Sequence, residues 1–487
     1  MLRSTIHREF LGVWFCFLAA CSSPAATYWV ATYGSDSNAG TSSNAPFLTP
    51  QKAVTLSGLA AGDTIYVRGG NYAFSAQVKP SKTGAAGNPV KLWAYPGEFP
   101  VWDFATMPAG TTKALDSRKD YWHIKGIEVK NAPDSGILIA GFGTIIEGCT
   151  VHDCGNDGFI FGSTSIRATN ALILNCDSYR NYGGGDGNNG DGFGAKTGCG
   201  PGNVFRGCRA WNNSDDGWDC YDNVTNSIVF QECWSFANGY NLWGYTGTWS
   251  GNGNGFKLGG ESTSATHYVT NCVTFGNRAK GFDHNNSHGG HVVVNCTGYS
   301  NNAANFSFYQ TPSNGTYNLM VNNASFVGTL FNLDPTTVQK TNSWQGFTVT
   351  AADFASLDTS AATNARATDF SLATGNLFRL AAGSDLIDRA VNVGLPFSGS
   401  GPDLGAFEYS VGSAQGPITL SSPRWTNGLF QLTVSGLTSH GEVVVLASSN
   451  LSSWTGIFTN PATSGAWQFT DSNAPASATK FYRVWEQ

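Results

Sequence analysis

The sequence contains few charged residues and no excess of positive charge. Asp, Glu, Lys and Arg make up 12% of the 487 residues, whereas about 25% is usual for soluble proteins. The formal net charge is −6. A chain without a basic surface lacks the means to neutralise phosphates, which argues against a nucleic acid partner. An acidic protein that binds an acidic polymer would need a cation between the two.

Long hydrophobic runs are also missing. The apolar run at residues 10–20 follows a basic start and is too short to span a bilayer, so we interpret residues 1–26 as a secretory signal. Leu18–Cys21 is similar to a bacterial lipobox, and we favour lipidation of Cys21 over ordinary cleavage after Ala25. We therefore expect a protein that is secreted or displayed on the bacterial surface or outer membrane, with membrane contact only through this lipid.

No helical period separates the short runs of β-branched and aromatic residues, and 60 glycines break them up. Six segments align instead on a cysteine, with an aromatic residue or histidine three positions later and, in most copies, an asparagine five positions later. The cysteine column is Cys149, Cys176, Cys208, Cys233, Cys272 and Cys296. The other columns are His152, Tyr179, Trp211, Phe236, Phe275 and Tyr299, then Cys154, Asn181, Asn213, Asn238, Asn277 and Asn301. Spacings of 24 to 39 residues predict an all-β solenoid, a parallel β-helix with the cysteine and asparagine columns inside.

The cysteine column points to small buried hydrophobic groups more than to disulfides. Cys199 and Cys220 lie outside the column and are the first candidates for a bridge.

The chain divides into four parts. After the signal segment, residues 27–410 are expected to form the β-helix, capped at its open end by a short amphipathic helix at 50–59. Residues 411–417 have the composition of a linker. Residues 418–487 alternate apolar and polar side chains, which predicts a small antiparallel β-sandwich without chemistry of its own.

Each repeat closes on an aromatic residue, and two repeats are stretched before it. The closing residues are Phe159, Phe193, Trp218, Phe256, Phe282 and Phe306. The usual gap from the cysteine is 10 residues, but it is 17 before Phe193 and 23 before Phe256. We expect these insertions to stand up as walls of a cleft. Trp243, Tyr245 and Trp249 in the second insertion suit either sugar faces or packing against the solenoid, and both interpretations stay open.

Strand alternation predicts where the charged groups point. If the closing aromatic residues face inward, the residue after each of them faces outward. Asp219 and Lys257 are two such residues in consecutive turns, so they should lie about 4.8 Å apart along the stack. Asp191 and Asp216 stand two positions before a closing aromatic residue, and Asp215 precedes Asp216. We expect these four carboxylates to converge beside the lysine.

Four carboxylates from two neighbouring turns form a hard, oxygen-rich site that suits Ca²⁺, and no set of histidines and cysteines suits zinc. The alternative is that Asp and Asn before Gly are simply good turn residues. This alternative explains Asp157 well. It explains the motif SDDGWD poorly, because its third acid, Asp219, lies on the strand. We favour the ion site.

The segments NGDGFGAK, GNVFRGCRAWNNSDDGWD, GNGNGFKLGG and GFDHNN resemble polysaccharide lyase family 9, the pectate lyases with a right-handed parallel β-helix. The resemblance runs from about Thr27 to Tyr409. It implies that Asp191, Asp215, Asp216 and Asp219 hold a catalytic Ca²⁺ and that Lys257 is the Brønsted base of β-elimination. It also implies an acidic plant polysaccharide as substrate, homogalacturonan or rhamnogalacturonan, and the motif does not separate the two.

Further substrate contacts are weaker hypotheses. Arg278, Lys280 and His284 are candidates for holding additional carboxylates, although each is also explained as solvated surface charge. We expect the protein to be a monomer. A β-helix polygalacturonase with paired acids is a second candidate class; SDDGWD could imitate such a pair, but no Arg-Lys pair follows it. A non-catalytic adhesin is the third class, and it would not need Lys257 beside the acids.

Overall fold

The computed structural model describes residues 25–487 except 111, 163–166, 197, 222–225, 261–262, 314, 332, 410–417, 427–428, 439–441, 450–453, 462, 474–479 and 487. Cys21, with the predicted signal up to residue 24, and the predicted linker at 411–417 lie outside the described residues. Among the described helices, none is both long and apolar enough to cross a membrane.

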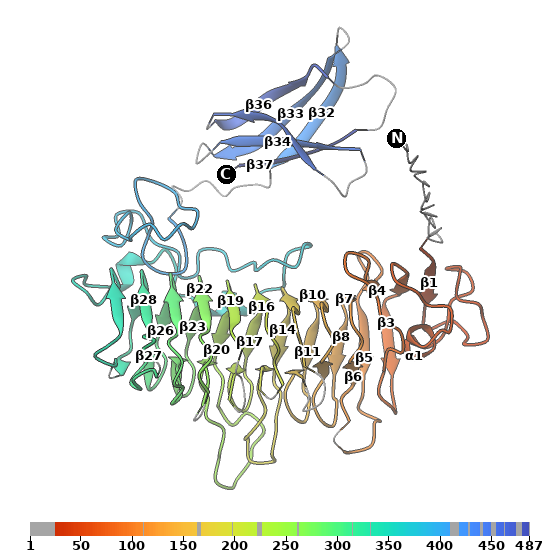
Figure 1. The fold of residues 1–487 in the computed structure, drawn as a ribbon, viewed down its shortest axis with the longest axis horizontal. Helices are drawn as coiled ribbons and strands as arrows, with labels where there is room; N and C mark the ends of the chain where they lie inside the picture. The colour runs from red at the N-terminus through yellow and green to blue at the C-terminus, as the bar shows by residue number, and fades with distance from the viewer. Residues whose placement is uncertain are drawn as a thin grey trace, which may run out of the picture.

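Short strands stack into a solenoid, as predicted (Figure 1). Within the described residues they form three parallel sheets of 12, 10 and 9 strands. Sheet A contains β1 (Thr27–Val30), β2 (Thr64–Val67), β4 (Val90–Ala94), β7 (Trp122–Lys125), β10 (Ile145–Glu147), β13 (Leu172–Leu174), β16 (Asn203–Arg206), β19 (Ile228–Gln231), β22 (Tyr268–Thr270), β25 (Val292–Val294), β28 (Leu319–Val321) and β31 (Val338–Lys340).

Sheets B and C complete each turn. Sheet B contains β3 (Gly70–Ala73), β5 (Pro100–Asp103), β8 (Glu128–Lys130), β11 (Thr150–His152), β14 (Asp177–Tyr179), β17 (Arg209–Trp211), β20 (Trp234–Phe236), β23 (Val273–Phe275), β26 (Thr297–Tyr299) and β29 (Ala324–Phe326). Sheet C contains β6 (Leu115–Ser117), β9 (Ile137–Ile139), β12 (Phe159–Phe161), β15 (Phe193–Gly194), β18 (Trp218–Asp219), β21 (Phe256–Lys257), β24 (Lys280–Asp283), β27 (Ala304–Ser307) and β30 (Leu330–Phe331).

The chain ends in two small antiparallel sheets, which agrees with the predicted sandwich. One sheet contains β32 (Thr419–Thr426), β33 (Leu429–Thr438) and β36 (Ser464–Asp471). The other contains β34 (Val443–Ser448), β35 (Thr455–Asn460) and β37 (Phe481–Glu486). Their shared core includes Val434 from the first sheet and Val445 from the second, both fully buried.

The predicted helix at 50–59 is shorter in the structure. The helix α1 spans Pro50–Val54, with the Thr49 side chain accepting a hydrogen bond from the Lys52 N–H at its start. It ends at Thr55, and the chain then turns towards Gly62, whose φ of 91° favours glycine. Ala53 and Val54 are fully buried, so even one and a half turns cover the apolar end of the solenoid beside β1.

The cysteine column lies inside, as expected. All six of its members are fully buried. The nine cysteines among the described residues are all free, so the bridge suggested for Cys199 and Cys220 is wrong. Both thiols lie in the apolar core, where they pack as small hydrophobic groups.

The asparagine column forms a hydrogen-bonded ladder along the stack. The Nδ2 group of Asn213 donates to Oδ1 of Asn238 at 3.0 Å, and Asn238 donates in the same way to Asn277 at 2.9 Å. Each Oδ1 also accepts a backbone N–H from the turn before, and Asn181 accepts the N–H of Cys154 where that cysteine replaces asparagine. Because every buried amide in this column has partners, the ladder holds successive turns in register.

The aromatic column lies on the outside of sheet B and is covered by the chain segment that follows β31. Tyr179 and Trp211 stack at 4.4 Å between ring centroids. The segment contains two 3₁₀ turns, η1 (Ala351–Asp353) and η2 (Thr359–Thr363), and packs Phe378 against this column. Arg366 reaches in from the same segment to Asp177 at 2.7 Å. The column therefore forms a second apolar core outside the solenoid.

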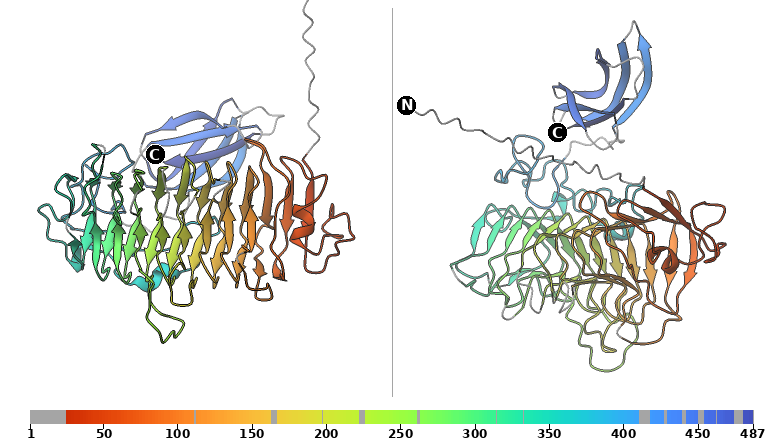
Figure 2. Two further views of the ribbon diagram at one scale, coloured as in Figure 1. Left: turned by 60° about the horizontal axis from the view of Figure 1, so that its bottom comes forward. Right: turned by 45° about the vertical axis from the view of Figure 1, so that its right-hand side comes forward.

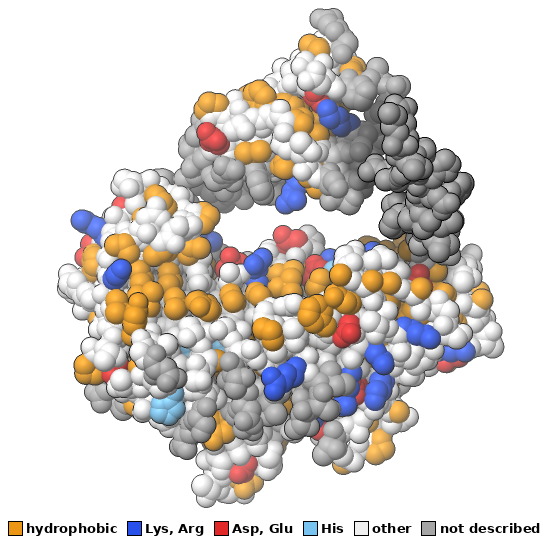
Figure 3. Space-filling model, viewed as in Figure 1, with side chains coloured by type: hydrophobic (Ala, Val, Ile, Leu, Met, Phe, Trp, Pro, Cys, Tyr) orange, Lys and Arg blue, Asp and Glu red, His pale blue; other side chains and the backbone are white. Residues whose placement is uncertain are grey.

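Sheet A presents an outward row of apolar residues that remain half-buried or exposed among the described residues. Figure 3 shows rows of hydrophobic side chains on the outside of the solenoid. In register across eight strands the row contains Ile145, Leu172, Val204, Val229, Tyr268, Val292, Leu319 and Val338, all half-buried or exposed.

Two stacked histidines bind backbone N–H groups between turns. The rings of His267 and His291 lie 5.3 Å apart. Nδ1 of His267 accepts the Ile228 N–H, and Nδ1 of His291 accepts the His267 N–H. Burial lowers the pKa of His267 to about 4 and, together with the neighbouring His267 and His284, lowers the pKa of His291 well below its usual value. Both rings are therefore neutral in the folded protein at pH 7.

We expect these two histidines to make a contribution to the free energy of unfolding that decreases as pH decreases. In the unfolded chain the two histidines bind protons with an ordinary pKa of about 6.5. In the folded protein their rings stay neutral at that pH. This contribution is therefore complete above pH 6.5 and is lost towards pH 4, by up to about 3 kcal/mol for His267. Urea unfolding of wild type and variant at pH 7.5 and pH 5 measures this contribution as a difference between their slopes, because the acidic residues titrate in both. His291→Asn should reduce it, because Asn318 already shows that an amide oxygen accepts this kind of N–H bond.

His288→Asn serves as the control, because the His288 side chain is only half-buried. Equal pH slopes in wild type and His291→Asn would contradict the assignment.

Candidate active site

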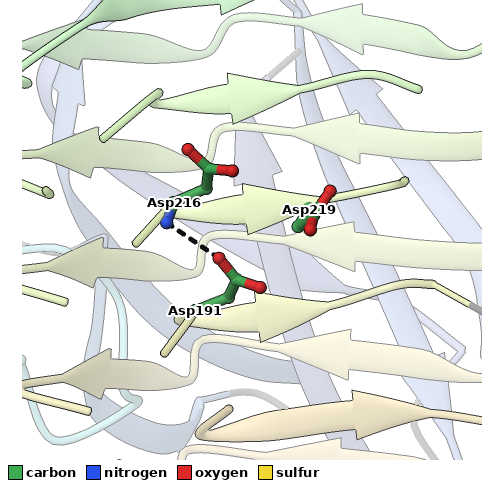
Figure 4. A group of neighbouring side chains, drawn as sticks. All are labelled: Asp191, Asp216 and Asp219. Carbon is green, nitrogen blue, oxygen red and sulfur yellow. Dashed lines mark hydrogen bonds between the residues drawn. The ribbon is translucent and has the colours of Figure 1, made fainter. Parts of the chain in front are cut away.

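The carboxylates belong to a second ladder, at the entrance to the strands of sheet C. Asp191 and Asp216 occupy equivalent places in neighbouring turns, and Figure 4 shows the N–H of Asp216 donating to Oδ1 of Asp191. Oδ1 of Asp216 accepts the N–H of Asn254 at 2.6 Å. Asp157 is the preceding rung, and its Oδ1 accepts the N–H of Asp191 at 3.2 Å. The repeat thus uses one oxygen of each carboxylate to align the turns.

Asp219 and Lys257 are neighbours on strands β18 and β21, as alternation predicted. The parallel register pairs Trp218 with Phe256 and Asp219 with Lys257. The two aromatic rings are fully buried and stack at 4.7 Å. Because the rings occupy the interior, the next residue on each strand points away from it, toward the carboxylate ladder.

Three carboxylates converge, each through one of its oxygens. Oδ1 of Asp219 accepts the Tyr221 N–H, and its Oδ2, like that of Asp191 and Asp216, has no backbone partner among the described residues. One oxygen from each of these three residues lies within 4.8 Å of the others. All three side chains are buried, Asp219 the least at 4% exposed.

Lys257 bridges this cluster. Its Nζ lies 3.1 Å from Oδ2 of Asp216 and 3.4 Å from Oδ2 of Asp219, with the Tyr221 ring 5.1 Å away. Burial alone would lower the pKa of Lys257, but the surrounding aspartates outweigh it and raise the pKa. Without a metal ion the amine is therefore held protonated.

A second lysine, which the sequence reasoning missed, lies on the other side of the cluster. Nζ of Lys196 is 2.6 Å from Oδ2 of Asp191, 3.3 Å from Oδ1 of Asp157 and 3.6 Å from Oδ2 of Asp219. The signal was present in the motif GFGAK, because Lys196 stands two positions after the outward Gly194. Asp157 is 1% exposed and belongs to the cluster, so the interpretation of it as a turn residue alone is incomplete.

Asp215 adjoins this group but is oriented differently. Its Oδ1 accepts the N–H of Asn252 at 2.6 Å and its Oδ2 accepts the N–H of Asn189 at 2.9 Å. These donors belong to the two insertions, so the carboxylate fastens both loops at their base. Burial, followed by the charges of Asp216 and Asp191, raises the pKa of Asp215 to about 9.

Repulsion between the carboxylates of the cluster also affects the pKa values of the other acids. Burial raises the pKa of Asp216 to about 7 and that of Asp157 to about 8, with Asp191 among the like charges beside both. Asp191 itself has a lowered pKa, because the ammonium groups of Lys196 and Lys257 outweigh its burial. The site therefore holds more negative charge than its two lysines neutralise.

The donor set fits a hard divalent cation. Oδ2 of Asp191 and Oδ2 of Asp216 are buried and accept no hydrogen bond from the described residues; each faces only a lysine ammonium. Carboxylate oxygens that accept no such hydrogen bond, in a cluster with excess negative charge, are the kind of ligand that Ca²⁺ prefers.

The predicted aromatic residues join the two insertions to each other. Figure 2 shows a yellow-green loop projecting from the solenoid. Tyr182 of the first insertion stacks on Trp243 at 4.7 Å and lies parallel to Trp249 at 6.0 Å. Tyr245 is 38% exposed and lies 6.4 Å from Trp249. These rings thus pack between the two insertions rather than against the solenoid, and this packing occupies part of their faces.

The three further residues that were predicted to contact substrate lie in different environments. Arg278 is exposed, and its guanidinium donates to the carbonyl of Gly251 in the second insertion at 2.6 Å. Lys280 pairs with Asp283 at 3.0 Å. His284 is 1% exposed, and its Nε2 accepts the Gln310 N–H, while burial lowers its pKa to about 4. His284 is thus a buried neutral ring and not a surface charge.

Comparison with known proteins agrees with this fold. A family model described as "Pel9A-like, right handed beta helix region" matches residues 28–342. Pectate lyase L of Dickeya dadantii is 38% identical over 395 residues, which cover 78% of this chain and 90% of that protein. Pectate lyase PEL9 of Emericella nidulans is 31% identical over 355 residues, covering 66% and 84%.

Two solved structures are similar over most of their length. Pectate lyase Pel9A has a TM-score of 0.73 at 37% identity and covers 79% of this chain and 97% of its own. A rhamnogalacturonan lyase has a TM-score of 0.63 at 28% identity and covers 74% and 97%. This chain therefore belongs to polysaccharide lyase family 9, the Pel9A-like right-handed parallel β-helix proteins.

Proposed function

We propose that this protein is a calcium-dependent lyase that cleaves pectate by β-elimination, with Lys257 as the base. The observation that carries the proposal is the placement of an amine beside three converging carboxylates on one face of the stack. The relatives named pectate lyase supply the substrate class. Asp191, Asp216 and Asp219 would hold the ion, and Asp215 would support it through the loops or as a fourth ligand.

The reaction breaks the C4–O bond of a uronate residue. Lys257 removes the proton from C5, the C–H electron pair forms the C4–C5 double bond, and the leaving oxygen takes up a proton. A bound Ca²⁺ supplies Lewis acidity that neutralises the uronate carboxylate and so acidifies the C5 proton. Lys257 must first lose its own proton, so the rate should rise with pH into the mildly alkaline range.

A rhamnogalacturonan backbone is the second candidate substrate, supported by the similar structure of a rhamnogalacturonan lyase. Trp243, Tyr245 and Trp249 keep partly exposed surfaces for sugar rings, and Arg278 and Lys280 remain candidates for uronate carboxylates. A polygalacturonase-type hydrolase would place no lysine between the acids. A non-catalytic adhesin would need none of this cluster.

The remaining expectations complete the proposal. We propose that residues 27–410 are the catalytic domain, joined through 411–417 to an accessory module at 418–487. We further propose a monomeric enzyme that works outside the cytoplasm, attached to the membrane only through a lipid on Cys21.

Product analysis tests the function. The full chain is incubated with polygalacturonate and with rhamnogalacturonan, each with and without chelator, and the products are analysed by mass and by ultraviolet absorbance. We expect unsaturated uronates from polygalacturonate, and none after chelation. Products of saturated mass with new reducing ends would indicate a hydrolase, and release from rhamnogalacturonan alone would move the substrate to the second candidate.

A further inference from the structure

Lys196 occupies ligand positions of the proposed ion site. Its Nζ lies 2.6 Å from Oδ2 of Asp191 and 3.6 Å from Oδ2 of Asp219, and both residues belong to the three whose carboxylates converge. The Lys196 side chain is only 16% exposed, so its ammonium is largely withdrawn from water and depends on these carboxylates. A lysine ammonium and a divalent cation cannot both take the same face of Oδ2 of Asp191.

Asp157 offers the same ammonium another partner at the outer edge of the cluster. Its Oδ1 is 3.3 Å from Nζ of Lys196, and the residue is 1% exposed. Asp157 is absent from the three converging residues. Gly194 makes the arrangement possible, because a Cβ at this position would come within 2.7 Å of Oδ2 of Asp157. A short movement of the flexible lysine side chain away from Asp191 therefore keeps its ammonium beside a carboxyl group.

We propose that Lys196 is a resident counter-ion of the site. In the metal-free protein it neutralises Asp191 and Asp219, and when a divalent cation enters it withdraws onto Asp157. Lys196 is then a positioning residue that sets the calcium affinity, and Asp157 is the residue that receives it. This inference rests on the proposed calcium site.

The inference predicts opposite effects at the two positions. Lys196→Met keeps most of the side-chain volume but removes the competing charge, so it should tighten calcium binding by on the order of tenfold or more. Asp157→Asn removes the alternative partner, leaves the ammonium on Asp191 and should weaken calcium binding. When Asp157→Asn is added to Lys196→Met, calcium affinity should hardly change further, because the ammonium that would move onto Asp157 is already absent.

Isothermal titration of the chelator-treated full chain with CaCl₂, without substrate, measures these affinities. Thermal unfolding adds a second readout: Lys196→Met should lower Tm in chelator and enlarge the rise in Tm on adding calcium, because uncompensated carboxylates repel one another. Lys340→Met, at an exposed position on β31, is the matched control and should change neither. Circular dichroism checks folding, and Lys196→Gln replaces the methionine variant if that one does not fold.

The outcomes separate this inference from the proposed function. A wild-type chain that binds no calcium would refute the calcium site itself, and the inference with it. Wild-type binding together with unchanged or weaker binding in Lys196→Met would refute only the counter-ion role. If Asp157→Asn weakened calcium binding equally in wild type and in Lys196→Met, Asp157 would act through its own charge. The proposed movement of the Lys196 ammonium onto Asp157 would then be wrong.

Discussion

Replacing Lys257 by alanine is expected to stop the release of unsaturated uronates. The loss of a general base costs about 10²- to 10⁴-fold in rate. Its Nζ lies 3.1 Å from Oδ2 of Asp216 and 3.4 Å from Oδ2 of Asp219, so the variant removes an ammonium from the cluster. Calcium affinity should therefore be kept or increased while activity disappears. Absorbance of the unsaturated product measures the rate, and calcium titration with circular dichroism verifies the site and the fold.

Lys257→Arg separates a base from a mere ion-pair partner. Arginine keeps the positive charge and reaches the same carboxylates, but its guanidinium does not lose a proton in proteins. If Lys257 acts as the base, the arginine variant is as inactive as the alanine variant. If the pair with Asp216 and Asp219 only supports the fold, arginine restores the rate. Lys340→Ala provides a surface lysine control. Near-normal activity in either Lys257 variant would refute the assignment and direct attention to Lys196, the other ammonium of the cluster.

Asp216→Asn should abolish calcium-dependent activity at low calcium concentration. The asparagine retains an Oδ1 that accepts the Asn254 N–H, so the ladder between turns is preserved. The variant loses the negative charge of one of the three converging carboxylates. We expect calcium affinity to fall by about two orders of magnitude or more, because a charged ligand of a hard cation is lost.

A stability measurement distinguishes a ligand from a structural residue at this position. Burial and the neighbouring acids raise the pKa of Asp216 to about 7, so its charged form destabilises the metal-free protein as pH rises above the ordinary value of 3.8. In chelator, Asp216→Asn should therefore have an equal or higher Tm than wild type, while the rise in Tm on adding calcium should vanish.

Asp358→Asn is the matched control. Asp358 is exposed and also accepts a backbone N–H, from Ser360, which asparagine can retain. A lower Tm for Asp216→Asn in chelator, with unchanged calcium affinity, would show that Asp216 is structural.

Much of the site followed from the repeat. Aligning the copies on the cysteine column placed Asp219 beside Lys257, and the register of β18 and β21 confirms that pairing. The same alignment placed Asp191 and Asp216 in one column. It also predicted an interior of cysteines and asparagines, which are fully buried or nearly so. In a stacked fold, equivalent positions in successive turns become neighbours in space, so a sequence column is already a spatial column.

Other features required the structure. The outward aromatic column looked like part of the repeat, but only the folded chain shows that the segment around Phe378 covers it, from more than 100 residues downstream of Phe275. The repeat contains no information on where that segment returns. For the same reason it did not show that Trp243 meets Tyr182, because the two lie in separate insertions that depart from the repeat.

The sequence by itself determined the stack, its columns and the acids and lysine that share one face, because the repeat length sets which residues lie one strand spacing apart. Only the tertiary structure decided which oxygen of each carboxylate is left for an ion, that Asp215 fastens the two loops, and that Lys196 and Asp157 complete the cluster. These features depend on side-chain conformation and on contacts between insertions. Both are set by the charges and packing that surround each group in the folded chain, and no column of the repeat records them.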